Sequence, residues 1–177
     1  MSEEDLAYIE EDLRSPCTQE IAVFRAFAEV VDRSENEVVV IDTAPTGHTL
    51  LLLDATQSYH REVERTQGEV EKAVKKLLPR LRNANETQVI IVTLPEATPV
   101  FEAMRLAEDL DRANIKSKWW IINKSIYLTA TESSFLKAKA SNEVRWIQKV
   151  ANISKGNFAV IGWKPNEIKG ENLKELL

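Results

Sequence analysis

Short apolar runs alternate along this chain with longer segments in which apolar residues recur every three or four positions. The runs are typical of buried strands, and the recurring pattern is typical of amphipathic helices. The predicted strands are residues 38–41, 89–93, 119–122 and 158–161. The predicted helices are residues 2–13, 18–31, 62–78 and 133–150, with others beginning at Leu50, at Thr98 and near Glu171. This alternation predicts an α/β fold, with a parallel sheet and helices on both faces.

The helix that follows the second predicted strand has a defined start and core face. Thr98 is placed at its N-cap and Pro99 at its first position, where an absent N–H leaves no bond unmade. Trp119 and Trp120 must face opposite sides of the sheet because strand side chains alternate, and we expect both to pack against helices. The apolar stripes expected to face the core are Val100, Met104, Ala107 and Leu110 in this helix, and Ile21, Phe24, Ala28 and Val31 in the helix over residues 18–31.

The composition limits the size, partners and location of the protein. Its 177 residues, 44% of them hydrophobic, fit a single domain over residues 1–177. The formal net charge of -5, with acidic and basic residues interleaved, argues against nucleic acid as a partner. The apolar stretches are much shorter than the roughly 20 residues of a membrane-spanning helix. The single cysteine, Cys17, excludes an internal disulfide, and since no secretory leader opens the sequence we expect a protein of the reducing cytosol.

One acidic residue, Asp42, directly follows the first predicted strand. Open α/β sheets bind their ligands at the carboxyl ends of their strands. In P-loop nucleoside triphosphatases a carboxylate at such a strand end holds Mg²⁺, usually through water, and this is the role predicted for Asp42. A strand that ends in aspartate also occurs in α/β folds that bind no nucleotide, so the pattern alone leaves both interpretations open.

A phosphate-binding loop is not found in this sequence. Such a loop has the pattern GxxxxGK[ST], whose backbone amides wrap the phosphates and whose lysine neutralises their charge. None of the five glycines is followed by lysine. The sequence therefore carries the magnesium side of a nucleotide site without the phosphate side, and we expect it to be a piece of a longer protein.

Residues 42–49 read DTAPTGHT, and residues 14–18 read RSPCT. The first segment resembles the signature of the arsenical pump-driving ATPases and of their relatives that deliver tail-anchored membrane proteins, and the second segment strengthens the resemblance, which covers almost the whole chain. It implies a partial P-loop NTPase domain, namely the C-terminal portion of one ATPase half without its phosphate-binding loop and first switch. Residues 50–56 look more like the second half of the tandem pump ATPase than the first.

The resemblance also implies roles for individual residues. Asp42 would be the magnesium-side carboxylate of the second switch, and Asn123 would read the adenine base, with Glu167 nearby. Cys17 and His48 would lie at the metalloid site, which is chemically sensible because trivalent arsenic and antimony are soft and a thiolate is a soft donor. The segment that relays the nucleotide state to this site would be Thr43, Ala44, Pro45, Thr46, Gly47, His48 and Thr49.

Several of these roles have a plain structural alternative. A lone cysteine such as Cys17 is commonly a small buried hydrophobe, and Asn123 could serve only to satisfy a backbone group at a strand end. One cysteine is too few for a three-coordinate arsenic site, so the other sulfurs would come from the rest of the protein or from another copy. Near Glu167 the sequence departs from the family, which commonly has proline where this chain has Gly162.

The resemblance implies the C-terminal part of a cytosolic ATPase that couples ATP binding and hydrolysis to arsenite or antimonite export. Its ligands would be ATP, Mg²⁺ and the metalloid as effector, and its partners the phosphate-loop region of the parent and a membrane arsenite pump protein. The alternative is a targeting ATPase for tail-anchored proteins, in which a CxxC zinc pair and methionine-rich helices are common. This chain has one cysteine and two methionines, which favours the arsenical branch. A nucleotide-independent interaction domain is a third interpretation.

The isolated chain is expected to be inactive, because stabilising the transferring phosphoryl group needs the missing lysine and amide cradle. In the fold that the resemblance implies, the missing first strand would lie beside residues 38–41. Its absence would leave backbone groups unpaired at a sheet edge and favour self-association. The expected location is the cytoplasm, peripherally associated with a membrane pump.

Overall fold

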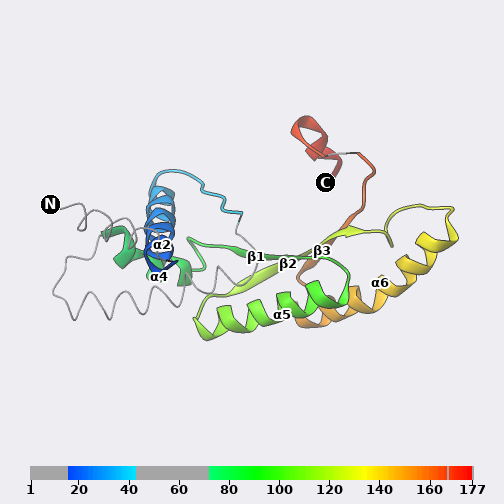
Figure 1. The fold of residues 1–177 in the computed structure, drawn as a ribbon, viewed down its shortest axis with the longest axis horizontal. Helices are drawn as coiled ribbons and strands as arrows, with labels where there is room; N and C mark the ends of the chain where they lie inside the picture. The colour runs from blue at the N-terminus through cyan, green and yellow to red at the C-terminus, as the bar shows by residue number, and fades with distance from the viewer. Residues whose placement is uncertain (1–15, 43–71, 167, 177) are drawn as a thin grey trace, which may run out of the picture. The chain divides into compact units, whose positions relative to one another are not determined.

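The computed structural model describes residues 16–42, 72–166 and 168–176, which fall into two compact units (Figure 1). The first unit lies within residues 1–87 and the second within residues 88–177. Each unit has its own packed elements. A single domain over the whole chain stays a prediction.

The described residues of the first unit form two packed helices and a short helical turn. Helix α2 (Pro16–Asp32) runs into the 3-10 helix η1 (Arg33–Glu35), and α2 packs against α4 (Lys72–Arg82). The helix predicted over residues 18–31 is thus confirmed. Helix α4 contains the end of the helix predicted over residues 62–78 and continues four residues past it. The predicted helices at the N-terminus and after Leu50 lie outside the described residues.

Apolar side chains on one face of α2 form the small core of this unit. Ala28 and Val31, three positions apart, are 1% and 7% exposed, and Leu77 of α4 is 2% exposed. Burial of these side chains against each other is the main favourable contribution to this helix pair. The core positions predicted for Ala28 and Val31 are confirmed, whereas the side chains of Ile21 and Phe24 lie outside the described residues.

The second unit is built on a three-stranded parallel sheet. Its strands are β1 (Val89–Thr93), β2 (Ser117–Ser125) and β3 (Phe158–Gly162), in the spatial order β1-β2-β3. Both neighbouring pairs are parallel. In register, Val92 lies opposite Ile121, and Ile121 lies opposite Ala159. The predicted α/β class with a parallel sheet is confirmed.

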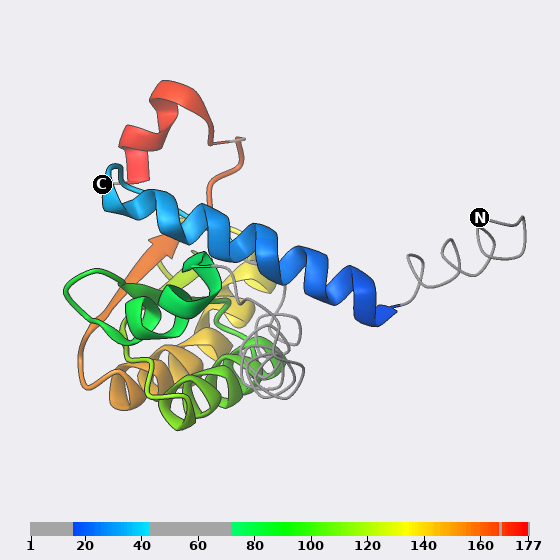
Figure 2. The same ribbon diagram turned by 90° about the vertical axis from the view of Figure 1, so that its left-hand side faces the viewer.

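The helices of the second unit connect consecutive strands. Helix α5 (Ala97–Arg112) joins β1 to β2, helix α6 (Ser134–Ile153) joins β2 to β3, and the 3-10 helix η2 (Gly170–Leu176) stands where the last helix was predicted. Figures 1 and 2 show α5 and α6 along the same face of the sheet. Because parallel crossover connections are right-handed, two successive crossovers in one direction place their helices on one face.

The core of the second unit lies between the sheet and these two helices. Ile91, Trp120 and Ile122 are 2%, 3% and 0% exposed on the covered face. Val100 of α5 and Val150 of α6 are fully buried against them. Burying one such aliphatic side chain contributes about 1.5–3 kcal/mol, so this layer holds the helices to the sheet.

The opposite face of the sheet is largely exposed. Ile90 is 49% exposed, Val92 59% and Trp119 45%. The two tryptophans thus face opposite sides as predicted, but only Trp120 is a core residue. Within the described part of this unit the predicted helix cover is found on one face of the sheet and not on the other.

The buried strand predicted over residues 38–41 is wrong. These residues form no strand and pair with none of the three described strands. Val38 is 94% exposed, Val40 89% and Ile41 38%. A β-branched apolar run is suited to a strand, but it becomes one only when a neighbouring strand accepts and donates its backbone hydrogen bonds. The described residues supply no such neighbour.

Two differences in element boundaries change the places of residues that were given a role. Helix α5 begins at Ala97 with Glu96 at its N-cap, so Thr98 is not the cap and Pro99 is the third helical residue. That position tolerates proline because the first N–H groups of a helix have no helical acceptor. Strand β2 continues to Ser125, so Asn123 lies inside the strand and not directly at its end.

Helix α6 confirms the helix predicted over residues 133–150. Its N-cap is Ser133, which was not predicted as a cap, and the Oγ of Ser133 accepts a hydrogen bond from the backbone N of Leu136 at 3.5 Å. In α5, Val100 and Leu110 are buried as predicted. The other two predicted core positions of α5 are only partly buried, and Ala103, which was not predicted, is buried in their place.

Residues 38–41 of this chain should exchange their amide hydrogens quickly. They have no strand partner among the described residues, whereas Ile121 and Ile122 lie in the central strand of the sheet. We expect exchange at residues 38–41 at least about 100-fold faster than at Ile121 and Ile122, measured by hydrogen-exchange NMR. Equal protection of the two segments would contradict the unpaired conformation.

The two faces of the sheet should respond differently to loss of a side chain. Ile122→Ala empties a fully buried site and should lower the free energy of unfolding by about 2–5 kcal/mol, since both transfer and cavity terms are lost. Ile90→Ala removes the same atoms from a half-exposed site and should lower it by less than about 1 kcal/mol. Urea unfolding followed by tryptophan fluorescence measures both, and equal losses would refute the assignment of the covered face.

Candidate functional site

The carboxyl ends of the three parallel strands lie at one edge of the second unit. Strand β1 ends at Thr93, β2 at Ser125 and β3 at Gly162. In open α/β sheets this edge is where ligands bind, because the loops that leave the strands there carry polar side chains and free backbone groups. The site predicted around Asn123 therefore lies at a position that the fold makes available.

The backbone beside Asn123 is irregular. The pairing of β2 with β3 shifts register between Ile122 and Ser125. Lys124, within this shift, has a φ of 56°, in the left-handed region that residues with a Cβ seldom adopt. The Oδ1 atom of Asn123 accepts a hydrogen bond from the backbone N of Lys124 at 2.9 Å. The carboxamide of Asn123 is thereby oriented by its own backbone, with its NH₂ group directed away from that bond.

The loops after β2 and β3 are joined by hydrogen bonds at this edge. The backbone N of Trp163 donates to the carbonyl of Ser125 at 2.8 Å. The hydroxyl of Thr129 lies 3.2 Å from the carbonyl of Ser125 and 3.0 Å from the carbonyl of Trp163. These bonds fix the two strand ends relative to each other, next to Asn123.

The start of α5 is also tied to this part of the unit. Glu96, at the N-cap of α5, forms an ion pair with Lys139 of α6 at 3.1 Å. Both side chains are about half exposed, at 50% and 44%, so the pair contributes little to stability and serves mainly to orient the two side chains.

Asp42 belongs to the first unit. It is exposed and ends the described part of the loop that follows η1. An exposed carboxylate offers hard oxygen donors of the kind that Mg²⁺ binds, with water filling the remaining positions. The carboxylate of Asp42 thus has the chemistry of a Mg²⁺ ligand, as its predicted role requires. Asp42 does not follow a strand in the described structure, however.

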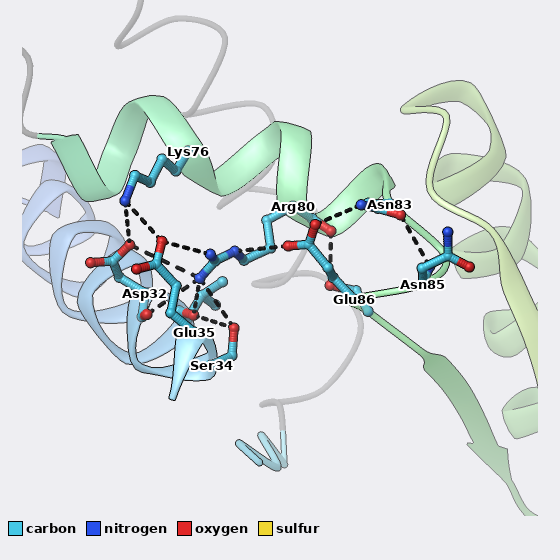
Figure 3. A network of polar contacts seen from close by, with 10 residues as sticks. Asp32, Ser34, Glu35, Lys76, Arg80, Asn83, Asn85 and Glu86 are labelled. Atoms are coloured by element: carbon cyan, nitrogen blue, oxygen red, sulfur yellow. Dashed lines mark hydrogen bonds and ion pairs between the residues drawn. The ribbon is translucent and has the colours of Figure 1, made fainter. Parts of the chain in front are cut away.

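A cluster of polar side chains joins the end of α2 to α4, upstream of Asp42 (Figure 3). The guanidinium of Arg80 donates to the backbone carbonyls of Val31 at 3.2 Å and Asp32 at 3.3 Å. The last carbonyls of a helix have no helical N–H partner, so Arg80 acts as a C-terminal cap for α2. We call this group the Arg80 cluster; its members are Asp32, Ser34, Glu35, Lys76, Arg80 and Glu86.

Glu35 is held by two cations of the Arg80 cluster. Its Oε1 atom lies 2.9 Å from Lys76 Nζ and 2.9 Å from Arg80 Nη2. The hydrogen bond and charge of Lys76, and the hydrogen bond from Arg80, lower the pKa of Glu35 below its ordinary value of 4.5. The hydrogen bond to Glu35 and the charge of Asp32 raise the pKa of Lys76 above 10.5.

The remaining predicted site residues are only partly described. Residues 43–49, including His48, and Glu167 lie outside the described residues. Cys17 lies in the first turn of α2, but its side chain is outside the described set. Asp42 and Asn123 belong to different units. The roles predicted for these residues therefore stay predictions.

Two residues of this edge were not predicted from the sequence. Ser125 and Glu143 are 0% and 2% exposed and contact each other. A signal for Glu143 was present, because it lies seven residues before the buried Val150 and so shares its face of α6. An acidic residue on a buried helical face requires hydrogen-bond donors opposite it.

The described residues form neither a cluster of metal ligands nor a membrane-spanning helix. No group of three or more His, Cys, Asp or Glu side chains there could hold a metal ion. No helix in the described ranges has the length and apolar character needed to cross a membrane.

Comparison with known proteins identifies the family. The chain matches the model of the anion-transporting ATPase family over residues 1–78 and 67–176. It is 46% identical over 170 residues to the arsenical pump-driving ATPase of Escherichia coli, covering 96% of this chain and 29% of that protein. It is also similar to the putative arsenical pump-driving ATPase of Halobacterium salinarum, at 29% identity over 98% of this chain and 29% of the relative. A relative named ATPase GET3C from Arabidopsis thaliana is 23% identical over 78% of this chain and 44% of its own length.

The chain belongs to the anion-transporting ATPase family. This confirms the family predicted from residues 42–49 and agrees with the α/β fold. The chain spans less than a third of the length of the relatives from Escherichia coli and Halobacterium salinarum, since it covers 29% of each.

The pKa of Glu35 makes the first unit sensitive to acid. Because the folded-state pKa is below the unfolded value of 4.5, the stabilisation is fully present above pH 4.5 and is lost as the pH falls through the folded pKa. Glu35→Gln should therefore flatten the fall in melting temperature as the pH is lowered below 4.5. The control Glu29→Gln removes an exposed carboxylate from the same unit and should follow the wild type. Parallel curves for all three proteins would contradict the proposed linkage.

Proposed function

We propose that this chain supplies the magnesium side and the base side of the nucleotide site in an ATPase that drives arsenite or antimonite export. The observation that carries the proposal is 46% identity, over 96% of the chain, to a protein named arsenical pump-driving ATPase. The DTAPTGHT sequence of residues 42–49 supports it, because this is the segment expected to sense the nucleotide.

The rest of the nucleotide site would lie in a longer parent protein. The chain covers 29% of the arsenical pump-driving ATPase of Escherichia coli and has no glycine followed by lysine. The phosphate-binding loop would therefore come from the remainder of the parent, and the 177-residue chain alone would hydrolyse no ATP. The parent would act in the cytoplasm beside a membrane pump protein.

Asp42 and Asn123 would hold opposite ends of the bound nucleotide. When Mg²⁺ is bound it would neutralise phosphate charge, and Asp42 would hold it through water. Asn123 would hydrogen-bond the adenine edge with its NH₂ group, whose orientation is set by the bond from the backbone N of Lys124. Glu167 would lie near the base.

The metalloid would act as an effector that is coupled to the nucleotide. Residues 43–49 would shift when the terminal phosphate leaves, and this would move His48 relative to Cys17. Since coupling between two binding sites is reciprocal, metalloid binding would in turn favour one nucleotide state. Cys17 alone gives one thiolate, so further donors from the parent would complete the metalloid site.

A targeting ATPase for tail-anchored proteins is less well supported. The chain has one cysteine, which cannot form a CxxC pair, and two methionines. The named arsenical pump-driving ATPase is also far more similar in sequence, at 46% identity, than ATPase GET3C at 23%.

Substitution of Asp42 in the parent ATPase tests the proposal. Asp42→Asn removes the negative charge that holds Mg²⁺ and should lower metalloid-stimulated kcat about 100-fold or more, with ATP affinity changed only a few-fold. The matched control Glu37→Gln, an exposed acidic residue of the same loop, should keep wild-type activity. Steady-state ATPase assays with and without arsenite measure both, and undiminished stimulated hydrolysis in Asp42→Asn would refute the role of Asp42.

A further inference from the structure

The buried carboxylate of Glu143 contacts the end of β2 and the loop that follows this strand. Glu143 of α6 is 2% exposed, and its Oε2 atom accepts two hydrogen bonds. One comes from the hydroxyl of Ser125 at 2.9 Å and the other from the backbone N of Tyr127 at 3.0 Å. Among the described residues Glu143 forms no ion pair, so these donors are what offsets the loss of water around its charge.

Ser125 connects this carboxylate to the rest of the strand-end edge. Its side chain donates to Glu143, while its carbonyl accepts from the backbone N of Trp163 at 2.8 Å and lies 3.2 Å from the hydroxyl of Thr129. A single fully buried residue thus joins α6, the loop after β2 and the end of β3. We call Ser125, Tyr127, Thr129, Glu143 and Trp163 the strand-end clamp.

The strand-end clamp directly follows the irregular backbone beside Asn123. The register shift and the positive φ of Lys124 lie between Ile122 and Ser125. A left-handed conformation at a residue with a Cβ persists only where surrounding contacts hold it. The nearest such contacts on the C-terminal side are those of Ser125, and the nearest on the other side is the bond that Lys124 makes to Asn123 itself.

We propose that Glu143 is a positioning residue for nucleotide binding. It holds the end of β2 in the conformation that presents the carboxamide of Asn123 to the base. The inference rests on the proposed function, in which Asn123 reads the adenine. Both donors to Glu143 belong to the segment immediately after Asn123, which is why the carboxylate acts on this residue and not on the phosphate side of the site.

The chemistry of position 143 gives a pair of variants that separate positioning from packing. In Glu143→Gln the side-chain oxygen still accepts the bonds from Ser125 and Tyr127, so the clamp is kept without its charge. In Glu143→Leu a side chain of similar size leaves both donors without an acceptor. The control Glu132→Leu makes the same change at an exposed acidic residue in the loop between β2 and α6.

The experiment compares a ligand that has a base with one that has none. Binding of ADP and of pyrophosphate, each with Mg²⁺, is measured by calorimetry on the parent ATPase. Glu143→Leu should weaken ADP binding roughly tenfold and leave pyrophosphate binding within about twofold, because only ADP depends on Asn123. Glu143→Gln and Glu132→Leu should bind both ligands like the wild type. Amide exchange of Tyr127 should rise in Glu143→Leu alone.

The outcomes separate this inference from the proposed function. If the wild type binds neither ligand, the proposed function fails, and Glu143 is then only a structural residue. If the wild type binds ADP more tightly than pyrophosphate but Glu143→Leu weakens both equally or neither, the positioning role is overturned while the proposed function stands. If Glu143→Leu does not fold, Ser125→Ala removes one donor from the clamp and should weaken ADP binding selectively, and equal loss of both ligands in that variant overturns the inference.

Discussion

The pairing of β2 with a parallel neighbour on each side is the constraint on which the second unit depends. Parallel pairing brings the carboxyl ends of all three strands to one edge, and the right-handed crossovers then place α5 and α6 on one face. The buried core and the candidate site follow from the same geometry, since Ile122 packs under the helices and Asn123, next in sequence, approaches the edge. A slip of one residue in this register would exchange the buried and exposed faces of the strand.

Features set by local sequence were predictable, and features set by distant partners were not. Strand β1 and helix α6 follow from a short apolar run and from apolar residues at helical spacing, which are patterns that act over a few residues. The segment over residues 38–41 has the same kind of apolar run, but its pairing depends on chain far away in sequence. For the site, the role of Asn123 was predicted from a family resemblance and stays a prediction, whereas Glu143 was missed because its hydrogen-bond partners lie 16 and 18 residues away.

The Arg80 cluster and the strand-end clamp hold charged side chains in opposite environments, one near water and one buried. The Arg80 cluster is rich in charges that lie near water, so its ion pairs are screened and respond to pH and salt. The strand-end clamp holds one carboxylate away from water with neutral donors, so it depends on hydrogen-bond geometry and hardly on salt. The first group fixes the end of α2 ahead of Asp42, and the second fixes the end of β2 beside Asn123.

The exposed apolar residues are consistent with a chain that works as part of a larger protein. Val38 and Val40 lie almost fully in water, and Ile90, Val92 and Trp119 expose apolar surface on one sheet face. Exposed apolar side chains of this kind often mark a contact with other polypeptide, because leaving them in water is unfavourable. The arsenical pump-driving ATPase of Escherichia coli has more than two thirds of its length beyond the matched region, since the chain covers 29% of it. Additional polypeptide that supplies a strand beside residues 38–41 would pair the backbone groups of these residues. The same strand would bring the phosphate-binding loop close to Asp42.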